Sequence, residues 1–181
     1  MPEIALFGGS FDPPHVGHLL AAAYVLATDP SDELWFVPVH EHPFGKKMSA
    51  PFEHRAALCE AMARELPRSR VSRLEQELGG EVRTVDLLEH LHKTRPGDRF
   101  ALILGADLAA ERAQWKRFDR IEQLARIIDI GRAGFAGAGQ QVVFPEVSST
   151  QVRSALRKGE DVSRLVPRAV LEAIRAAGTY R

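Results

Sequence analysis

The chain has 181 residues, of which 45% are hydrophobic and 27% are charged, a composition typical of a globular protein with a sizeable core. Its 24 Lys and Arg side chains balance 24 Asp and Glu side chains, so the formal net charge is zero. That balance disfavours a nucleic-acid-binding protein, which would carry a basic excess. It still allows a local cluster of cations around a small phosphorylated ligand.

The cysteine content and the N-terminal residues give information about the cellular compartment in which the protein works. Cys59 is the single cysteine, which excludes an intrachain disulfide and a cysteine-rich zinc site. Residues 1–3 lack the basic start of a signal peptide. The longest apolar run, residues 19–27, is far shorter than the about 20 residues that span a bilayer. We therefore expect a cytoplasmic protein with no membrane partner.

Strand-like and helix-like segments alternate along the chain. In chain order, the hydrophobic patterns predict strand 4–7, helix 15–28, strand 34–37, helix 52–66, strand 71–74, helix 84–93, strand 100–104, helix 119–124, strands 126–130 and 142–144, and helices 149–157 and 167–177. Several strands are apolar on both faces, which is typical of a parallel sheet covered by helices on both sides. We predict one α/β domain over residues 1–181, with a Rossmann-like doubly wound parallel sheet and C-terminal helices.

The loop at residues 8–14 joins the first predicted strand to the first predicted helix. Gly8 and Gly9 allow a ligand to approach the backbone closely, and Pro13-Pro14 stiffens the entry to the helix. A helix start presents free N–H groups and a partial positive charge, which suit a phosphate. This junction is therefore a candidate phosphate-binding loop.

Two histidines follow at the start of the helix. His15 and His18 are three residues apart, so both lie on one face of the first turn. A side chain larger than that of Gly17 would crowd anything bound against this turn. Taken alone, the pair would be two surface histidines at a capped helix start. The segment is not a Walker loop, because no Gly-Lys-Ser/Thr follows, and it lacks Gly-x-Gly-x-x-Gly.

A second pattern, Val-Ser-Ser-Thr-Gln-Val-Arg, occupies residues 147–153. Its Ser and Thr residues offer hydroxyls and helix-start amides, and Arg153 lies about one turn inside the helix. The pattern predicts a phosphate cradle, although a capped helix with a solvated arginine is the more common meaning of so short a motif.

The sequence Gly-Gly-Ser-Phe-Asp-Pro-Pro-His-Val-Gly-His at residues 8–18 resembles the motif of the nucleotidyltransferase superfamily with a His-x-Gly-His pair. It is most similar to bacterial nicotinate-nucleotide adenylyltransferases, which also carry Ile-Ser-Ser-Thr-x-x-Arg where this chain has residues 147–153. The resemblance implies a sheet of the nucleotidyltransferase type and transfer of AMP from ATP to nicotinate mononucleotide, with Mg²⁺ held mainly by the ATP phosphates and no protein metal site. Catalytic roles are implied for His15 and His18.

Further segments extend the resemblance over nearly the whole chain. Residues 104–107 are similar to a Gly-x-Asp that meets the nucleotide, and Lys46 falls where the family has Pro-Pro-His-Lys. The resemblance implies ATP-binding roles for Gly8, Gly9, Ser10, Phe11, Gly17, Lys46, Gly105, Asp107, Ser148, Ser149, Thr150 and Arg153. For the acceptor it implies Arg83, Thr84, Trp115 and Arg132. Asp12 and Asp107 are both candidates for orienting Mg²⁺ or the ribose.

The chain departs from the family mainly around the acceptor pocket. Arg83 replaces a Tyr, residues 42–45 replace Pro-Pro-His, and Ala133 replaces a Pro. Two alternatives therefore stay open: a phosphopantetheine adenylyltransferase, which shares both motifs, and a nucleotide-binding regulator of the same fold without turnover. Trp115 and the segment at residues 84–86 favour the nicotinate acceptor.

Two other groups of residues contain side chains capable of chemistry. The pairs His40/His42 and His90/His92 contain metal-ligating side chains, but a loop pair and a helix pair would not naturally converge on one ion. Cys59 lies in an apolar helical pattern, so we expect a packed core residue and not a nucleophile.

Overall fold

A computed structural model describes residues 1–41, 45, 47–105, 115–131 and 144–180. Its centre is a sheet of five parallel strands in the order β3-β2-β1-β4-β5. The strands are β1 (Glu3–Gly9), β2 (Glu33–Pro38), β3 (Ser69–Val71), β4 (Arg99–Gly105) and β5 (Arg126–Ile130). The chain moves outward from β1 to β3 and then crosses back to the other side of β1, so the sheet is doubly wound, as the sequence predicts.

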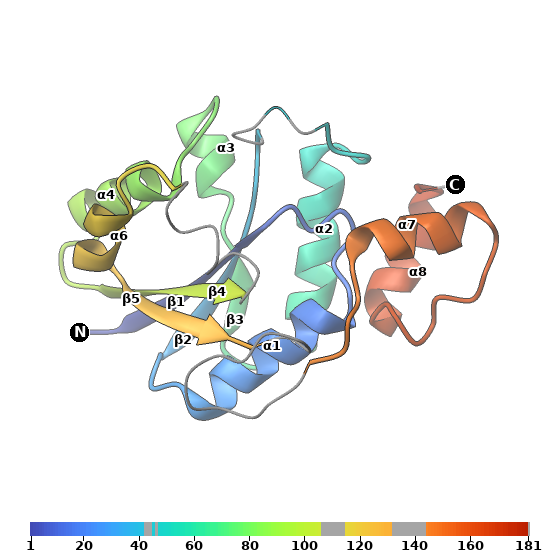
Figure 1. Cartoon of the computed structure of the whole chain (residues 1–181), viewed down its shortest axis with the longest axis horizontal. Helices are drawn as coiled ribbons and strands as arrows, with labels where there is room; N and C mark the ends of the chain where they lie inside the picture. The colour runs from blue at the N-terminus through green and yellow to red at the C-terminus, as the bar shows by residue number, and fades with distance from the viewer. Residues whose placement is uncertain (42–44, 46, 106–114, 132–143, 181) are drawn as a thin grey trace.

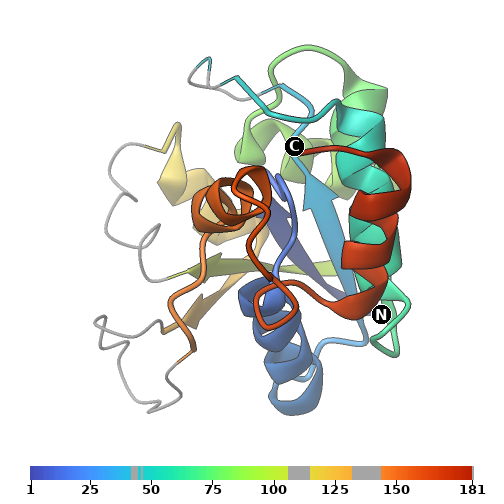
Figure 2. The ribbon, with the colours of Figure 1, turned by 90° about the vertical axis from the view of Figure 1, so that its right-hand side faces the viewer.

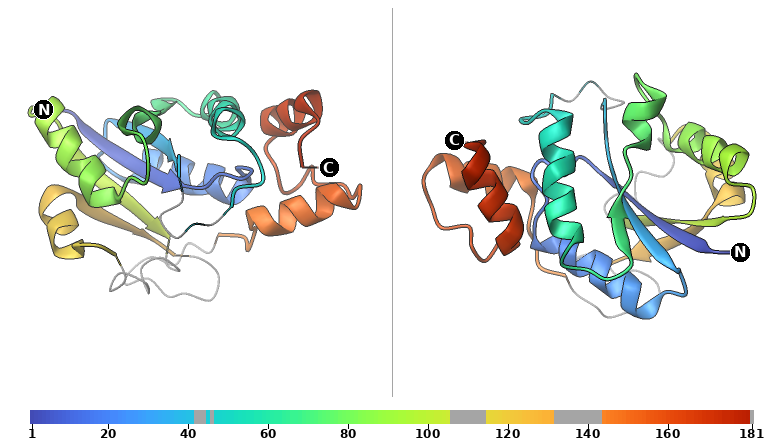
Figure 3. Two further views of the ribbon diagram at one scale, coloured as in Figure 1. Left: turned by 90° about the horizontal axis from the view of Figure 1, so that it is seen from above. Right: turned by 180° about the vertical axis from the view of Figure 1, so that it is seen from behind.

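Helices cover both faces of this sheet (Figure 1). They are α1 (Val16–Thr28), α2 (Phe52–Ala63), α3 (Leu74–Leu78), α4 (Thr84–Thr94), α6 (Phe118–Leu124), α7 (Ser149–Arg157) and α8 (Arg168–Ala177). α1 and α2 lie on one face, and α4 and α6 lie on the other (Figure 3). α8 packs along α2, beyond the edge of the sheet (Figure 2).

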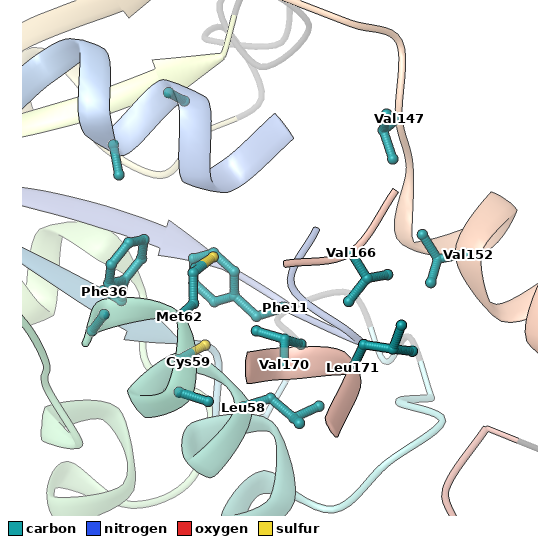
Figure 4. Close-up of a cluster of buried hydrophobic side chains, with 14 of the residues drawn as sticks. Phe11, Phe36, Leu58, Cys59, Met62, Val147, Val152, Val166, Val170 and Leu171 are labelled. Carbon is teal, nitrogen blue, oxygen red and sulfur yellow. The ribbon is translucent and has the colours of Figure 1, made fainter. Parts of the chain in front are cut away.

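Alternation along the strands divides the buried side chains into two apolar clusters. Ile4 and Leu6 of β1 face α4 and α6, whereas Ala5 faces α1 and α2. The face covered by α1 and α2 carries the larger cluster, which continues through Phe11 into α8 (Figure 4). Cys59 is fully buried there, as expected of a core residue. Burial raises the pKa of its thiol, so the group stays protonated.

The structure corrects one predicted strand. Residues 71–74 do not form it: β3 ends at Val71 and α3 begins at Leu74. Val71 packs against the apolar cluster beneath α1 and α2, whereas Leu74 packs against the cluster beneath α4 and α6, so the two residues belong to different elements. α2 also ends three residues earlier than predicted, and the carbonyl of Ala63, its last residue, accepts the hydroxyl of Ser69.

The predicted strand at 142–144 falls largely on residues that the structure does not describe. Among the described residues, none of the helices has the length and apolar character that crossing a bilayer requires.

Candidate active site

A cavity of about 540 Å³ opens at the carboxyl ends of β1 and β4, where the strand order reverses. In doubly wound sheets this is the position at which ligands bind. The first loop, the start of α1 and the start of α7 line one part of the wall, and α3, the start of α4 and Trp115 line another.

The first loop is shaped by the packing of Phe11. This side chain is buried, and its ring lies edge-on to Phe36 with 5.8 Å between the ring centroids. The backbone of Phe11 has a φ of 45°, a value that residues other than glycine rarely adopt. A Cβ on Gly9 would lie 3.0 Å from the Phe11 ring, so any larger residue there would require this buried ring to shift. Gly8 has no neighbouring atom within 4 Å of a built Cβ, which leaves its backbone open to a ligand.

His15 and His18 form a stacked pair at the start of α1. Their ring centroids are 3.7 Å apart, His15 is 2% exposed, and the His18 ring also lies edge-on to Phe11 at 4.8 Å. The simpler prediction of two surface histidines is therefore wrong for His15. A Cβ on Gly17 would lie 3.0 Å from Nδ1 of His15, so glycine at this position makes room for the pair.

A backbone hydrogen bond fixes the tautomer of His18. The N–H of His15 donates to Nδ1 of His18 at 3.1 Å. Because Nδ1 accepts, the neutral imidazole carries its proton on Nε2. His18 also lines the cavity. In the first turn of α1, the neutral His18 imidazole can therefore donate a hydrogen bond only through Nε2.

The start of α7 is bonded directly to the first loop. The hydroxyl of Ser149 donates to the carbonyl of Pro13 at 2.9 Å, and Nη1 of Arg153 donates to the carbonyl of Asp12 at 2.6 Å. Ser148 caps the helix by accepting from the N–H of Gln151. The two sequence motifs, more than 130 residues apart in the chain, thus form one wall of the cavity.

Asp12 joins this wall to the segment before α2. Its two carboxylate oxygens accept the N–H groups of Ser49 and Ala50 at 2.6 and 3.1 Å. A carboxylate used in this way fixes one loop to another.

Arg55 on α2 bonds to the first loop and to the segment before α2, and the sequence analysis did not predict this role. It is 1% exposed, and its guanidinium donates to the carbonyls of Ser10 at 2.7 Å, Val39 at 2.7 Å and Ala50 at 3.2 Å. Burial lowers the pKa of the guanidinium, and the negative charge of Asp12 opposes that effect. In the sequence, Arg55 is indistinguishable from a solvated arginine on an amphipathic helix.

Glu75 is a second residue that the sequence did not single out. It lies on α3, lines the cavity, and accepts the N–H of His40 at 2.9 Å. Burial raises the pKa of its carboxyl to about 7, and the hydrogen bond and the charge of Arg55 oppose the shift.

The far wall of the cavity carries the predicted acceptor residues. Arg83 and Thr84 lie at the start of α4, and Arg83 forms an ion pair with Glu81. The ring of Trp115 also lines the cavity and lies edge-on to Phe118 at 6.1 Å. A flat aromatic wall beside the amides of a helix start is suited to an aromatic acid.

Most of the predicted site residues meet at this one cavity. Those that line it are Gly8, Gly9, Ser10, Phe11, His15, Gly17, His18, Arg83, Thr84, Gly105, Trp115, Ser148, Ser149, Thr150 and Arg153. Lys46, Asp107 and Arg132 lie outside the described residues. Of the histidine pairs, His92 places Nε2 2.7 Å from the carbonyl of Leu124, and His42 is not described.

Comparison with known proteins agrees with this geometry. Residues 6–155 match a family model described as "Cytidylyltransferase-like". The chain therefore belongs to the cytidylyltransferase-like family of nucleotidyltransferases, and its fold is that of this class. A solved structure, nicotinic acid mononucleotide adenylyltransferase of Plasmodium falciparum complexed with NaAD, superposes with a TM-score of 0.85 at 20% identity, covering 99% of this chain and 98% of its own.

Relatives with higher sequence identity indicate a particular group within this family. Proteins named "Probable nicotinate-nucleotide adenylyltransferase" are 48% identical in Anaeromyxobacter dehalogenans and 40% identical in Thermus thermophilus. Each alignment covers 99% of this chain, with 97% and 100% of the respective relative. Within its family the chain is an adenylyltransferase of the nicotinate-nucleotide group.

The three hydrogen bonds from Arg55 to backbone carbonyls lead to a prediction about stability. Arg55→Lys keeps the charge but cannot reach three carbonyls at once, so buried acceptors lose their partners. We expect the free energy of unfolding to fall by about 3 kcal/mol, measured by urea denaturation. The control is Arg64→Lys at the exposed end of α2, with a change of less than about 0.5 kcal/mol. Equal changes in the two variants would show that the three bonds contribute nothing.

The buried carboxyl of Glu75 generates a prediction about pH. Its pKa is raised from 4.5 to about 7 in the folded state, so the folded protein holds this proton more tightly than the unfolded chain. The contribution of Glu75 to stability is therefore present below pH 4.5 and is lost as pH rises to about 7.

Glu75→Gln keeps an acceptor for His40 but cannot ionise. It should become more stable than the wild type as pH rises from 5 to 8, by up to about 3 kcal/mol. Thermal melts of both proteins across this range make the comparison, with Glu77→Gln on the exposed side of α3 as control. A difference that does not change with pH would contradict the raised pKa.

Proposed function

We propose that the protein transfers AMP from ATP to nicotinate mononucleotide, giving deamido-NAD and pyrophosphate in NAD biosynthesis. The observation that carries the proposal is the arrangement of the cavity. Groups of the first loop and α7 that suit a phosphate line one part of the cavity, and Thr84 and Trp115 line another. The names of the relatives support the same acceptor.

On the ATP side, His18 would bind the transferring α-phosphate through Nε2–H. His15, Ser149, Thr150 and Arg153 would hold the β- and γ-phosphates, together with Lys46. The open backbone at Gly8 and the end of β4 at Gly105 leave room for the nucleoside. Asp107 is the remaining candidate for the ribose, because the oxygens of Asp12 are bonded to backbone amides.

The reaction needs no protein base. The acceptor is a phosphate monoester with a second pKa of about 6, so at neutral pH it is largely a dianion. One of its oxygens attacks the α-phosphorus in line, a new P–O bond forms, and the bond between the α-phosphorus and the bridging oxygen breaks. That oxygen leaves with pyrophosphate. Catalysis then depends on positioning and on stabilisation of the charge that develops at the α-phosphate.

The metal ion of the proposed reaction would be held mainly by the ATP phosphates. The described residues contain no group of three or more His, Cys, Asp or Glu side chains placed to bind a metal. Mg²⁺ keeps most of its water and binds triphosphates with few protein ligands. When bound, it would neutralise part of the phosphate charge. His18 and Arg153 would then act on the oxygens that the ion leaves exposed.

The acceptor would stack its ring on Trp115 and meet donors at the start of α4 with its carboxylate. Backbone amides near Thr84 supply donors there. Arg83 stands where the resemblance to the family implies a tyrosine, and it lines the cavity in an ion pair with Glu81. A nicotinamide ring has no negative charge and brings its own N–H groups toward these donors, so we expect the acid to be preferred.

The role of His18 is tested by removing its donor. His18→Ala should lower kcat by roughly 10²–10³-fold, the scale for losing one preorganised donor to a developing charge. ATP affinity should change less than kcat, because the other phosphate contacts stay. The measurement is steady-state release of pyrophosphate. Turnover near that of the wild type would refute the mechanism.

The acceptor assignment is tested with a panel of nicotinate mononucleotide, nicotinamide mononucleotide and phosphopantetheine. The acid should give the highest kcat/KM, and Trp115→Ala should raise its KM by about tenfold while the KM for ATP stays nearly constant, because stacking contributes about 1–3 kcal/mol. Phe118→Leu, which removes the ring beneath Trp115, serves as the control for packing. An equal rate with the amide would remove the nicotinate assignment. No pyrophosphate with any acceptor would indicate a regulator.

A further inference from the structure

Glu75 is a buried carboxyl group on the cavity wall that the reaction described above does not use. It lies on α3, a helix of five residues between α2 and α4 (Figures 1 and 3). The residue is 9% exposed and lines the cavity together with Arg83 and Thr84 at the start of α4. It therefore belongs to the part of the wall that the acceptor would occupy.

Contacts with neighbouring elements hold α3 on two sides. Arg73, the residue before the helix, forms ion pairs with Glu53 and Glu60 of α2, the second at 3.0 Å. Leu74, the first residue of the helix, packs against the apolar cluster beneath α4 and α6. The backbone that carries Glu75 is therefore in place before a ligand binds, as a specific binding site requires.

The two oxygens of the Glu75 carboxyl have different surroundings. Oε2 accepts the N–H of His40 at 2.9 Å, which fixes one side of the group to the segment after β2. Among the described residues, none donates a hydrogen bond to Oε1, and this oxygen is not enclosed by protein atoms. Since Glu75 lines the cavity, Oε1 can accept a hydrogen bond from a bound ligand. Burial raises the pKa of the carboxyl, so such a donor would stabilise its ionised form.

The chemistry of the acceptor limits what can donate to this oxygen. At neutral pH, nicotinate mononucleotide carries a carboxylate and a phosphate that is largely a dianion, and an ionised Glu75 would repel both. The nitrogen of its pyridinium ring has no proton to donate. Its main donors are therefore the 2′- and 3′-hydroxyls of the ribose. Carboxylates also bind ribose hydroxyls in other nucleotide sites of doubly wound sheets.

We propose that Glu75 binds a ribose hydroxyl of the acceptor through Oε1 and thereby favours a ribosyl phosphate as the acceptor. The inference rests on the proposed function, because it takes nicotinate mononucleotide as the substrate. Oε2 stays on the N–H of His40, and Oε1 accepts the hydrogen bond of the hydroxyl. Thr84 and Trp115 then recognise the ring and its carboxylate, while Glu75 recognises the sugar that joins the ring to the phosphate.

The first part of the test is the variant Glu75→Gln, which keeps an acceptor for His40 and removes the charge. With nicotinate mononucleotide, kcat/KM should fall about tenfold, the scale of one hydrogen bond to a charged group. KM for ATP should stay within about twofold, because the ATP groups are separate contacts. Glu77→Gln, on the exposed side of the same helix, is the matched control and should behave as the wild type.

The second part compares nicotinate mononucleotide with its 2′-deoxy and 3′-deoxy forms in the wild type and in Glu75→Gln. In the wild type, removing the hydroxyl that Glu75 binds should lower kcat/KM about tenfold. In Glu75→Gln, removing the same hydroxyl should lower it only about twofold, because a neutral amide binds a hydroxyl more weakly than a carboxylate does. The ratio is taken within each protein, so a partly unfolded variant lowers both rates equally and leaves the ratio unchanged.

Two results would overturn the inference, and they are distinguishable. If the wild type transfers AMP to nicotinate mononucleotide but both deoxy ratios are equal in the wild type and Glu75→Gln, this inference fails alone. If the wild type transfers no AMP to nicotinate mononucleotide, the proposed function fails and this inference fails with it.

Discussion

The candidate site depends on one buried guanidinium. Arg55 bonds to carbonyls of three segments that leave β1, leave β2 and enter α2. Buried apolar side chains such as Phe11 and Ala50 anchor these segments, and backbone carbonyl groups of all three turn toward the interior, where they need donors. A planar fork with several donors can join them at once, which a single ammonium group cannot. Asp12, bonded to the neighbouring amides, balances the buried charge. The wall formed by the first loop and α7 is therefore built on a polar network as much as on the apolar cluster beneath it.

The network around Arg55 and Asp12 supports a loop in which the orientation of the two histidines is fixed. His18 has its Nδ1 occupied by a backbone N–H, and its ring is held between His15 and Phe11. A donor that is already oriented needs no rearrangement as charge develops on a phosphate. Gly9 and Gly17 have a steric role, because a Cβ at either position would lie 3.0 Å from the ring of Phe11 or His15 and would require that ring to shift. The motif at residues 8–18 thus combines groups that face the ligand with groups that only shape the loop.

The sequence predicted the features that local patterns determine. Strand and helix order, the two motifs and their meeting at the carboxyl end of β1 follow from periodicity and from the rule for doubly wound sheets. It did not predict Arg55 or Glu75 as site-supporting residues, because their roles arise from contacts between residues 16 to 45 positions apart in the chain. The error at residues 71–74 arises because one apolar residue ends a strand and the next begins a helix, and the sequence alone does not show that Val71 and Leu74 pack in different clusters.

The central claim is that His18 presents a preset Nε2–H to a nucleotide phosphate. Nitrogen-15 NMR of histidine side chains tests it most directly, on free protein and with a non-hydrolysable ATP analogue. We expect His18 to show an unprotonated Nδ1 and a protonated Nε2 in the free protein, and a shift at Nε2 but not at Nδ1 when the analogue binds. A proton on Nδ1, or an Nε2 resonance that the bound analogue leaves unchanged, would contradict the claim.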